Sequence, residues 1–335
     1  MEYPSLDKPT AGAFRFNTDS SQMEIYDGNQ WTVVLATSPE QQTGGTRGIF
    51  AGGEGHPAGA HSIVTYVNVS SAGDADTFGD LTQSGAAFAC SSRTRGLCLM
   101  NNPDRKSVDK INISTLGDGV NWGDLVNAMW QRGGVASSTR GLWAGGQYPG
   151  SQTYDKIDAV TIASEGSAFE FGDLTVSVCD HIGFSSPTRG VWGGGITAPG
   201  STYRDTIDYV QIATAGNAAD FGNLVGAFRL PQSCSNATRG MWGGGQTPTL
   251  KDELQYVTIA SLGDATDFGN LTSARAGGGA CSSPTRGIWA GGYNPSKTNI
   301  IDYVQIMTTG NAVDFGDLTV PTQYNGTFSN GHGGL

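Results

Sequence analysis

The sequence predicts an all-β fold, a six-bladed β-propeller with four-stranded blades that follows a short β-hairpin module. Three observations predict it. Glycine makes up 51 of the 335 residues, and a glycine inside a helix costs about 1 kcal/mol relative to alanine, which disfavours long helices. A unit of about 47 residues recurs along the chain, the period expected of propeller blades. A strand missing from the first unit reappears near the C-terminal end.

The first 37 residues contain no copy of the repeat. Residues 9–17 read as a turn followed by a strand, 23–26 as a second strand and 31–34 as a third. Asp27 and Gly28 form a dipeptide that is typical of tight hairpin turns. We expect residues 1–37 to form a β-rich segment, 38–45 a linker, and 46–335 the propeller.

Each unit begins at a Thr-Arg-Gly string, which starts at Thr46, Thr94, Thr139, Thr188, Thr238 and Thr285. An apolar run closed by two glycines follows in every unit except the second, which reads Leu-Cys-Leu-Met-Asn over 97–101. Next come a β-branched segment, such as 207–212, and a turn. The unit then reaches an aromatic residue before Gly-Asp/Asn-Leu, namely Phe78, Trp122, Phe171, Phe221, Phe268 and Phe315. A run of small residues leads to the next unit, so each unit predicts four short strands.

The ends of the chain distinguish a ring from an open solenoid. Residues 38–42 do not match the small-residue strand that should precede the first Thr-Arg-Gly, whereas 326–331 align with 87–93. We therefore expect the C-terminal strand to complete the first blade and close the ring, which removes exposed sheet edges. A solenoid would need capping repeats instead.

The units resemble kelch repeats over residues 46–335. The glycine pair after the second strand, the Asp-Tyr-Val third strand at 208–210 and the aromatic that enters the fourth strand carry the resemblance. The chain departs from the pattern by having mostly Phe where the family has Trp in the fourth strand. The resemblance implies a propeller fold, which hosts binding scaffolds and a few enzymes.

The N-terminal segment resembles a module of tailed-bacteriophage fibre and other virion proteins. Residues 12–17 match its Gly-Ala-aromatic-Arg-Phe-Asn strand, and 26–31 match its Tyr-Asp-Gly-x-x-Trp hairpin. The resemblance implies a virion-docking or oligomerisation segment in residues 1–37, with other virion proteins as partners and a homotrimer as one option. A hairpin packed on its own propeller is the alternative.

Composition excludes several classes of function. The net charge is −11, which disfavours binding to nucleic acid or to anionic membranes. No apolar stretch is long enough to insert in a membrane. Five cysteines and four scattered histidines predict neither a metal site nor a cofactor. Cys90, Cys234 and Cys281 occupy equivalent repeat positions and are expected to be buried. We find no phosphate-binding loop and no marked catalytic triad.

Two kinds of charged residue, an arginine and an aspartate, recur from unit to unit and could have a function. The arginines of the Thr-Arg-Gly strings would form an anion-binding ring, but we expect each to pair with an aspartate such as Asp208 or Asp302. Aspartates around Asp220 and Asp314 are expected to serve turns rather than calcium, because the spacing lacks alternating oxygen ligands. The six arginines are Arg47, Arg95, Arg140, Arg189, Arg239 and Arg286.

The candidate binding residues lie in connections that vary between units, because varied loops on a repeated scaffold often carry recognition. We expect the loops between second and third strands to share one face with the connections between blades. The first set is Glu54, His56, Asn102, Asp104, Arg105, Tyr148, Tyr203, Lys251 and Tyr293. The second set is Trp130, Arg132, His181, Arg229 and Arg275. Exposed loop residues without a ligand are the alternative.

These features together predict a non-enzymatic structural protein of a phage virion, assembled in the host cytoplasm. It would belong to a tail or fibre, or be an appendage on the capsid surface. Its propeller would bind a host glycan, a host surface protein or another virion protein. Two alternatives stay open: a carbohydrate-active propeller enzyme, and a cellular kelch-type interaction scaffold.

Overall fold

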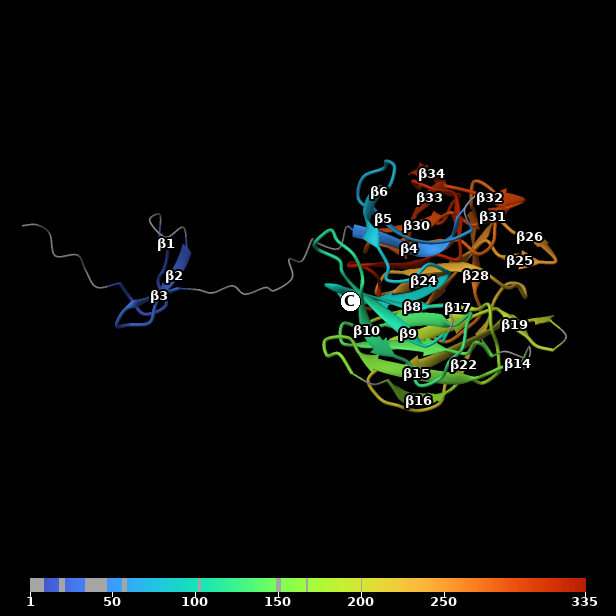
Figure 1. Ribbon diagram of the computed structural model, residues 1–335, viewed down its shortest axis with the longest axis horizontal. Coiled ribbons are helices and arrows are strands. Elements are labelled where there is room, and N and C mark those ends of the chain that lie inside the picture. The colour runs from blue at the N-terminus through green and yellow to red at the C-terminus, as the bar shows by residue number, and fades with distance from the viewer. Residues whose placement is uncertain are drawn as a thin grey trace, which may run out of the picture. The chain divides into compact units, whose positions relative to one another are not determined.

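The computed structural model describes residues 9–17, 22–33, 47–55, 59–101, 104–148, 152–166, 168–199 and 201–335. Contacts divide the chain into two units, Met1–Gln41 and Gln42–Leu335. The predicted linker, 38–45, lies outside the described residues. The described residues form strands and no helix (Figure 1), which confirms the all-β class. Accordingly, no helix in these residues could cross a membrane.

The first unit is a three-stranded antiparallel meander, as predicted. It consists of β1 (Phe14–Asn17), β2 (Gln22–Tyr26) and β3 (Trp31–Val33), in that order. Asp27 accepts hydrogen bonds from the backbone N–H groups of Asn29 and Gln30, both at 2.8 Å. These hydrogen bonds, which shape the turn between β2 and β3, lower the pKa of Asp27. Arg15 joins the strands, because it pairs with Glu24 at 2.6 Å and lies over the Trp31 ring.

Among its described residues the second unit contains six antiparallel sheets of four or five strands, besides four two-stranded hairpins. Sheet 1 is β4 (Arg47–Gly55), β5 (Gly59–Asn68) and β6 (Asp76–Asp80), joined by β35 (Thr322–Gln323) and β36 (Gly326–Ser329). Sheet 2 is β7 (Ala87–Ser91), β8 (Arg95–Met100), β9 (Ser107–Asn112) and β10 (Val120–Asp124). Sheet 3 is β11 (Gly133–Ala136), β12 (Arg140–Ala144), β15 (Lys156–Thr161) and β16 (Phe169–Asp173).

The other three sheets repeat this order. Sheet 4 is β17 (Ile182–Ser185), β18 (Arg189–Gly193), β21 (Thr206–Gln211) and β22 (Ala219–Asn223). Sheet 5 is β23 (Gln232–Ser235), β24 (Arg239–Gly243), β27 (Glu253–Thr258) and β28 (Thr266–Asn270). Sheet 6 is β29 (Gly279–Ser282), β30 (Arg286–Ala290), β33 (Ile300–Gln305) and β34 (Val313–Asp317).

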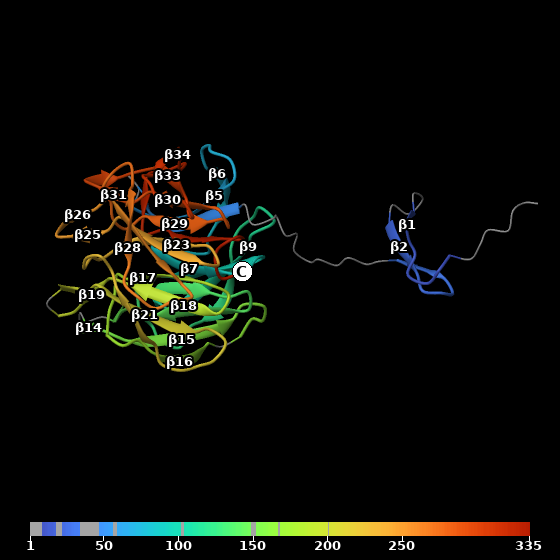
Figure 2. The ribbon, with the colours of Figure 1, turned by 180° about the vertical axis from the view of Figure 1, so that it is seen from behind.

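Small hairpins project between the second and third strands of sheets 3 to 6. They lie together on one side of the second unit, and the C-terminus lies on the opposite side (Figures 1 and 2). The hairpins are β13 (Gln147–Tyr148) with β14 (Gln152–Thr153), β19 (Ile196–Thr197) with β20 (Thr202–Tyr203), β25 (Gln246–Thr247) with β26 (Thr249–Leu250), and β31 (Tyr293–Asn294) with β32 (Ser296–Lys297). Isolated bridges such as Trp130 with Gln147 join them to the connections between sheets, so the predicted sharing of one face is confirmed.

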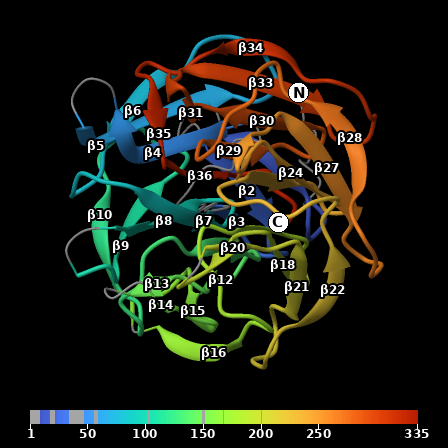
Figure 3. The ribbon, with the colours of Figure 1, turned by 90° about the vertical axis from the view of Figure 1, so that its right-hand side faces the viewer.

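The sheets are arranged around a common centre in a propeller-like fold (Figure 3). The first strand lies innermost in sheets 2 to 6, and β36 takes this place in sheet 1. Each inner strand contacts the next in the order β7, β11, β17, β23, β29, β36, β7. The C-terminal strand β36 pairs with β4 of the first sheet, with Phe328 opposite Ile49, as the repeat alignment predicts. Asn330 follows it and accepts a hydrogen bond from the Arg47 N–H at 3.0 Å.

Buried tryptophans fill the space between neighbouring sheets. Trp143, Trp192, Trp242 and Trp289 occupy equivalent positions in second strands and are almost completely buried. The indole N–H of Trp143 donates to the Phe88 carbonyl of the preceding sheet at 3.0 Å, and Trp192 contacts the Gly133 carbonyl in the same way. Every one of the four rings contributes apolar burial, and Trp143, Trp192 and Trp242 add a hydrogen bond between sheets, whereas the Trp289 indole N–H has no partner among the described residues.

A belt of serine hydroxyls links the inner strands. The hydroxyls of Ser91, Ser185, Ser235, Ser282 and Ser329 each donate to a backbone carbonyl of the preceding inner strand, at 2.5–2.9 Å. Because the strands crowd together at the centre, only small side chains fit, and serine also supplies a donor there. The equivalent residue of sheet 3 is Ala136, which has no hydroxyl group to offer the Ser91 carbonyl.

His332 supplies the donor that Ala136 lacks. Its Nε2 lies 2.7 Å from the Ser91 carbonyl, and its Nδ1 accepts the Gly334 N–H at 3.1 Å. An Nδ1 that accepts a hydrogen bond leaves the proton on Nε2, so the neutral ring donates to Ser91. Burial lowers the pKa of His332 to about 4, which keeps this neutral form near pH 7. His332 thus fixes the C-terminal tail to the inner strands on the side of the second unit opposite the hairpins.

The repeated arginines pair differently from the prediction, so the expected ion pairs with Asp208 and Asp302 are wrong. Each arginine donates to backbone carbonyls at the end of the third strand of the next sheet. Arg140 contacts the Ile212 carbonyl at 2.7 Å, and Arg286 of sheet 6 contacts the Ser70 carbonyl of sheet 1 at 2.9 Å. The guanidinium groups also lie over third- and fourth-strand aromatic rings, such as Tyr256.

The repeated aspartates also connect neighbouring sheets. Asp264, in the turn before the outer strand of sheet 5, accepts the Asn223 N–H of sheet 4 at 2.9 Å. Asp302, buried in β33, accepts both the N–H and the hydroxyl of Thr272 from the loop after the preceding sheet. Asp208 accepts the same pair from Thr175. Asp264 therefore serves a turn, as expected of the acids near the fourth strands, whereas Asp220 and Asp314 themselves lie within strands β22 and β34.

We predict that His332→Ala lowers the free energy of unfolding by about 1–3 kcal/mol, because it leaves the buried Ser91 carbonyl without this donor. Ala136→Ser in the same chain should recover part of the loss, since a hydroxyl at position 136 would complete the serine belt. Chemical denaturation of the two single variants and the double variant measures the coupling. Strictly additive effects would contradict the proposed substitution of His332 for a serine.

Candidate functional site

A cavity opens at the centre of the second unit, on the face that carries the hairpins. Residues at the start of the inner strands of sheets 1 to 6 line it, and its volume is about 80 Å³. Small residues such as Gly134, Gly277, Gly278 and Gly326 leave this space free. The polar side chains of the lining are Gln131, Asp180, His181, Gln232, Ser233, Tyr324, Asn325 and Thr327.

A ring of residues with left-handed backbone conformation surrounds the cavity. One such residue stands two positions before each inner strand, and the set is Gly85, Gln131, Asp180, Leu230, Gly277 and Tyr324. This conformation turns the backbone toward the neighbouring sheet: Leu230 N–H donates to the Asp180 carbonyl at 2.8 Å, and Gly277 N–H donates to the Leu230 carbonyl at 3.0 Å. The left-handed conformation costs a residue other than glycine about 1–2 kcal/mol of folding free energy. Such backbone strain often clusters at binding sites.

Several buried polar atoms in the lining have no hydrogen-bond partner among the described residues. They are Gln131 Oε1, Asp180 Oδ1, and both terminal amide atoms of Gln232 and Asn325. Gln232 is 1% exposed and Asn325 is 6% exposed. Buried polar groups are nearly always satisfied, and leaving one unsatisfied costs about 1–3 kcal/mol. The cavity therefore presents both donors and acceptors that a polar ligand could satisfy.

Asp180 is the carboxylate of the cavity lining. Its Oδ2 lies 3.6 Å from Arg229 Nη1, and the residue is only 5% exposed. Burial raises the pKa of Asp180 to about 6, with Arg229 opposing the shift. The group is therefore largely ionised at neutral pH, but at a cost in folding stability. A buried carboxylate of this kind is a common feature of functional sites.

His181 lies in the same lining and is the sequence candidate that borders this cavity. Burial first, and then the positive charge of Arg132, lower the pKa of His181 to about 3, against a smaller effect of the Ala144 backbone. The ring is therefore neutral over the physiological range. It contributes a polar but uncharged surface beside Asp180.

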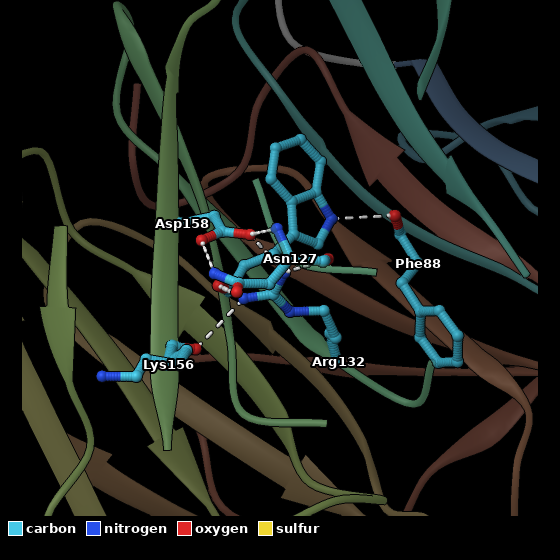
Figure 4. A network of polar contacts seen from close by, with 6 residues as sticks. Phe88, Asn127, Arg132, Lys156 and Asp158 are labelled. Carbon is cyan, nitrogen blue, oxygen red and sulfur yellow. Dashed lines mark hydrogen bonds and ion pairs between the residues drawn. The ribbon is translucent and has the colours of Figure 1, made fainter. Parts of the chain in front are cut away.

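Arg132 and Arg275 are not rim residues, so this part of the site prediction is wrong. Both guanidinium groups are fully buried in ion pairs, Arg132 with Asp158 at 2.6 Å and Arg275 with Asp302 at 3.0 Å. Arg132 also donates to the backbone carbonyls of Trp143 and Lys156 (Figure 4). These contacts hold the second and third strands against the segment that enters the inner strand, which is a structural role.

The other candidates lie in several separate places. Arg105 stacks over the Trp130 ring at 3.9 Å, Glu54 accepts a hydrogen bond from Gln323 at 3.0 Å, and Lys251 pairs with Glu253. Asp104 accepts the Ser107 hydroxyl within its own loop. Tyr148, Tyr203 and Tyr293 lie on hairpins, with Tyr148 and Tyr293 exposed. His56 and Asn102 lie outside the described residues.

Sequence reasoning missed Asp180, Gln232 and Asn325. They fall in or beside the run of small residues for which the sequence predicts only a strand. The usable signal was a departure from the repeat: the position of Gln232 holds glycine in three other units, as Gly133, Gly279 and Gly326. Large polar residues at a crowded central position were therefore the clue.

Cysteines and acidic residues supply no further site. The predicted burial of Cys90, Cys234 and Cys281 is confirmed, and burial raises the pKa of Cys281 to about 12. In the part of the chain that the structure describes, no three His, Cys, Asp or Glu side chains come together in a group that could hold a metal ion.

In comparisons with known proteins, no family model and no curated protein matches the sequence.

We predict that Arg132→Ala lowers the free energy of unfolding by about 3–5 kcal/mol, because it leaves the buried Asp158 charge uncompensated. The exposed Arg93→Ala variant is the matched control and should change stability by less than about 0.5 kcal/mol. Urea denaturation of both variants measures the difference. Equal, small effects would show that the buried pair is not needed for stability.

We also predict that Asp180→Asn stabilises the protein at high pH. The pKa of Asp180 is raised on folding from 3.8 to about 6, so the folded state holds the proton more tightly and wild-type stability falls as pH rises across that interval. The charged and titratable groups that act on it are Arg229, Tyr324 and Cys179. Removing the charge should add about 2–3 kcal/mol above about pH 7 and nothing below about pH 4.

Denaturation curves at several pH values test this prediction. Asp267→Asn, at an exposed position in β28, is the matched control and should show no such pH dependence. A pH-independent effect of Asp180→Asn would mean that the carboxylate is not destabilised by burial.

Proposed function

We propose that the second unit is a closed, six-bladed, kelch-like propeller that serves as a binding module. Three cyclic relations support this reading: the contacts of inner strands from β7 to β36 and back, the pairing of β36 with β4, and the arginine contacts that return from Arg286 to Ser70. The paired glycines that end the second strands, such as Gly244 and Gly245, both have positive φ angles, which supports the likeness to the kelch pattern.

We further propose that the protein is a non-enzymatic structural component of a phage virion and binds through the hairpin face. The observation that carries the binding role is the central cavity, where unpartnered buried amides gather on the face with the varied loops. Glycosidases commonly use two carboxyl groups flanking the scissile bond, whereas Asp180 is the single carboxylate among the described lining residues. This favours recognition over cleavage.

The N-terminal unit supports the proposed attachment to the virion. A three-stranded meander is marginally stable alone, and its Phe14 side chain is 63% exposed. A second protein surface that covers this apolar group would stabilise the unit. Residues 1–37 would therefore dock the chain on other virion proteins and leave the propeller free to bind a host glycan, a host surface protein or a further virion protein.

Particle association tests the proposal. We expect the full chain to copurify with virions of the phage that encodes it and to be seen on them by immunogold electron microscopy. A chain lacking residues 1–37 should keep the cooperative thermal unfolding of the propeller but be lost from particles. Absence of the full chain from purified particles would refute the virion role. Release of products in a glycan-cleavage screen would instead favour the enzyme alternative.

A further inference from the structure

We propose that the central cavity binds a neutral pyranose sugar, held by the amides of Gln232 and Asn325 and by the carboxylate of Asp180. This inference rests on the proposed binding role and names the ligand class. It uses only side chains whose buried polar atoms lack partners among the described residues.

The hydrogen-bonding inventory of the site matches sugar hydroxyls. Gln232 and Asn325 each offer one unpartnered amide nitrogen and one unpartnered oxygen, and Asp180 and Gln131 each offer an unpartnered oxygen. An amide can donate to one hydroxyl and accept from its neighbour, because a hydroxyl group is both donor and acceptor. Vicinal hydroxyls of a pyranose ring therefore satisfy both atoms of each amide, which a ligand with acceptors alone would not.

The charge of the site favours a neutral ligand. The lining contains Asp180 but no lysine or arginine among the described residues, and His181 is neutral. Arg229 is already placed beside Asp180, with Nη1 3.6 Å from Oδ2. A carboxylate or phosphate on the ligand would meet the Asp180 charge in a poorly solvated place without a free cation, which is unfavourable. Uronic acids and phosphosugars should therefore be rejected.

The lining of the site combines aromatic and polar groups. Phe88 and Tyr324 supply aromatic surface to the lining, and small-molecule sites commonly combine apolar walls with a few polar groups. The Tyr324 ring packs above Gly277, where a Cβ would come within 2.9 Å of it. Gly278 and Gly279 flank the two amides closely, since a Cβ on them would lie 3.0 Å from Gln232 Nε2 and 2.9 Å from Asn325 Oδ1. The glycines thus leave room for the two buried amide side chains beside the cavity.

Direct binding to the full chain tests the inference. Saturation-transfer NMR and calorimetry would use glucose, galactose, mannose and N-acetylglucosamine, with glucuronic acid as the anionic probe. We expect at least one neutral sugar to bind with one-to-one stoichiometry and to bind at least tenfold more tightly than glucuronic acid. Gln232→Ala and Asn325→Ala should each weaken that binding at least tenfold.

Gln305→Ala is the matched control, because Gln305 is exposed on β33, and it should leave the affinity unchanged. Gln232→Glu keeps the size of the side chain, so it separates lost recognition from lost packing if Gln232→Ala fails to fold. The thermal midpoint of each variant reports folding. Weakened binding by a folded Gln232→Glu variant would support the assignment.

Three results would overturn the inference. The first is that no neutral sugar binds at concentrations up to about 50 mM, which would detect a millimolar Kd. The second is that folded cavity variants bind as the wild type does, and the third is that the anionic sugar binds better.

These outcomes are distinguishable from failure of the proposed function. A chain that is present on virions but binds no sugar refutes only the ligand class. A chain that binds sugar but is absent from virions refutes only the virion role.

Discussion

The fold of the second unit depends on one constraint: every sheet must be covered on both faces by a neighbour. A four-stranded sheet with two apolar faces cannot bury both by itself. The chain meets this constraint by placing the sheets side by side around a centre. Hydrogen bonds join neighbouring sheets from their inner strands out to their third strands. Serine hydroxyls link the inner strands, indole N–H groups link second strands to inner strands, aspartates link third strands to loops, and arginines link the turns to third-strand ends. Each contact is modest, but the set repeats from sheet to sheet.

This arrangement explains why the repeat is strict in some places and free in others. Thr-Arg-Gly hardly varies because its arginine reaches the next sheet, which carries an equivalent carbonyl. The hairpins vary because they project away from the contacts between sheets. The cavity lining combines both kinds of behaviour. Its backbone repeats a left-handed conformation, while its side chains differ from sheet to sheet. A symmetric scaffold thereby presents an asymmetric surface.

Repetition in the sequence was sufficient to predict the strands, the sheet type and the pairing of the C-terminal strand. It was insufficient for partners that lie in the next unit. Arg140 was expected to bind an aspartate, yet its partner is the carbonyl of Ile212, whose position next to Arg140 follows only from how the sheets stack. Arg132 and Arg275 could not be separated from exposed rim residues for the same reason. Asp180 and Gln232 were overlooked because their importance comes from facing a shared cavity, and convergence of separate units is invisible along the chain.

The pairing of β36 with β4 also bears on the order of synthesis. The ribosome makes β4 well before β36, so the inner edge of β4 lacks this partner until translation has passed Ser329. A prematurely terminated chain keeps this edge and its apolar neighbours uncovered, which marks it for proteolysis or aggregation. The strand order thus links protection of the β4 edge to synthesis of β36, because a chain that stops before Gly326 leaves this edge unpaired.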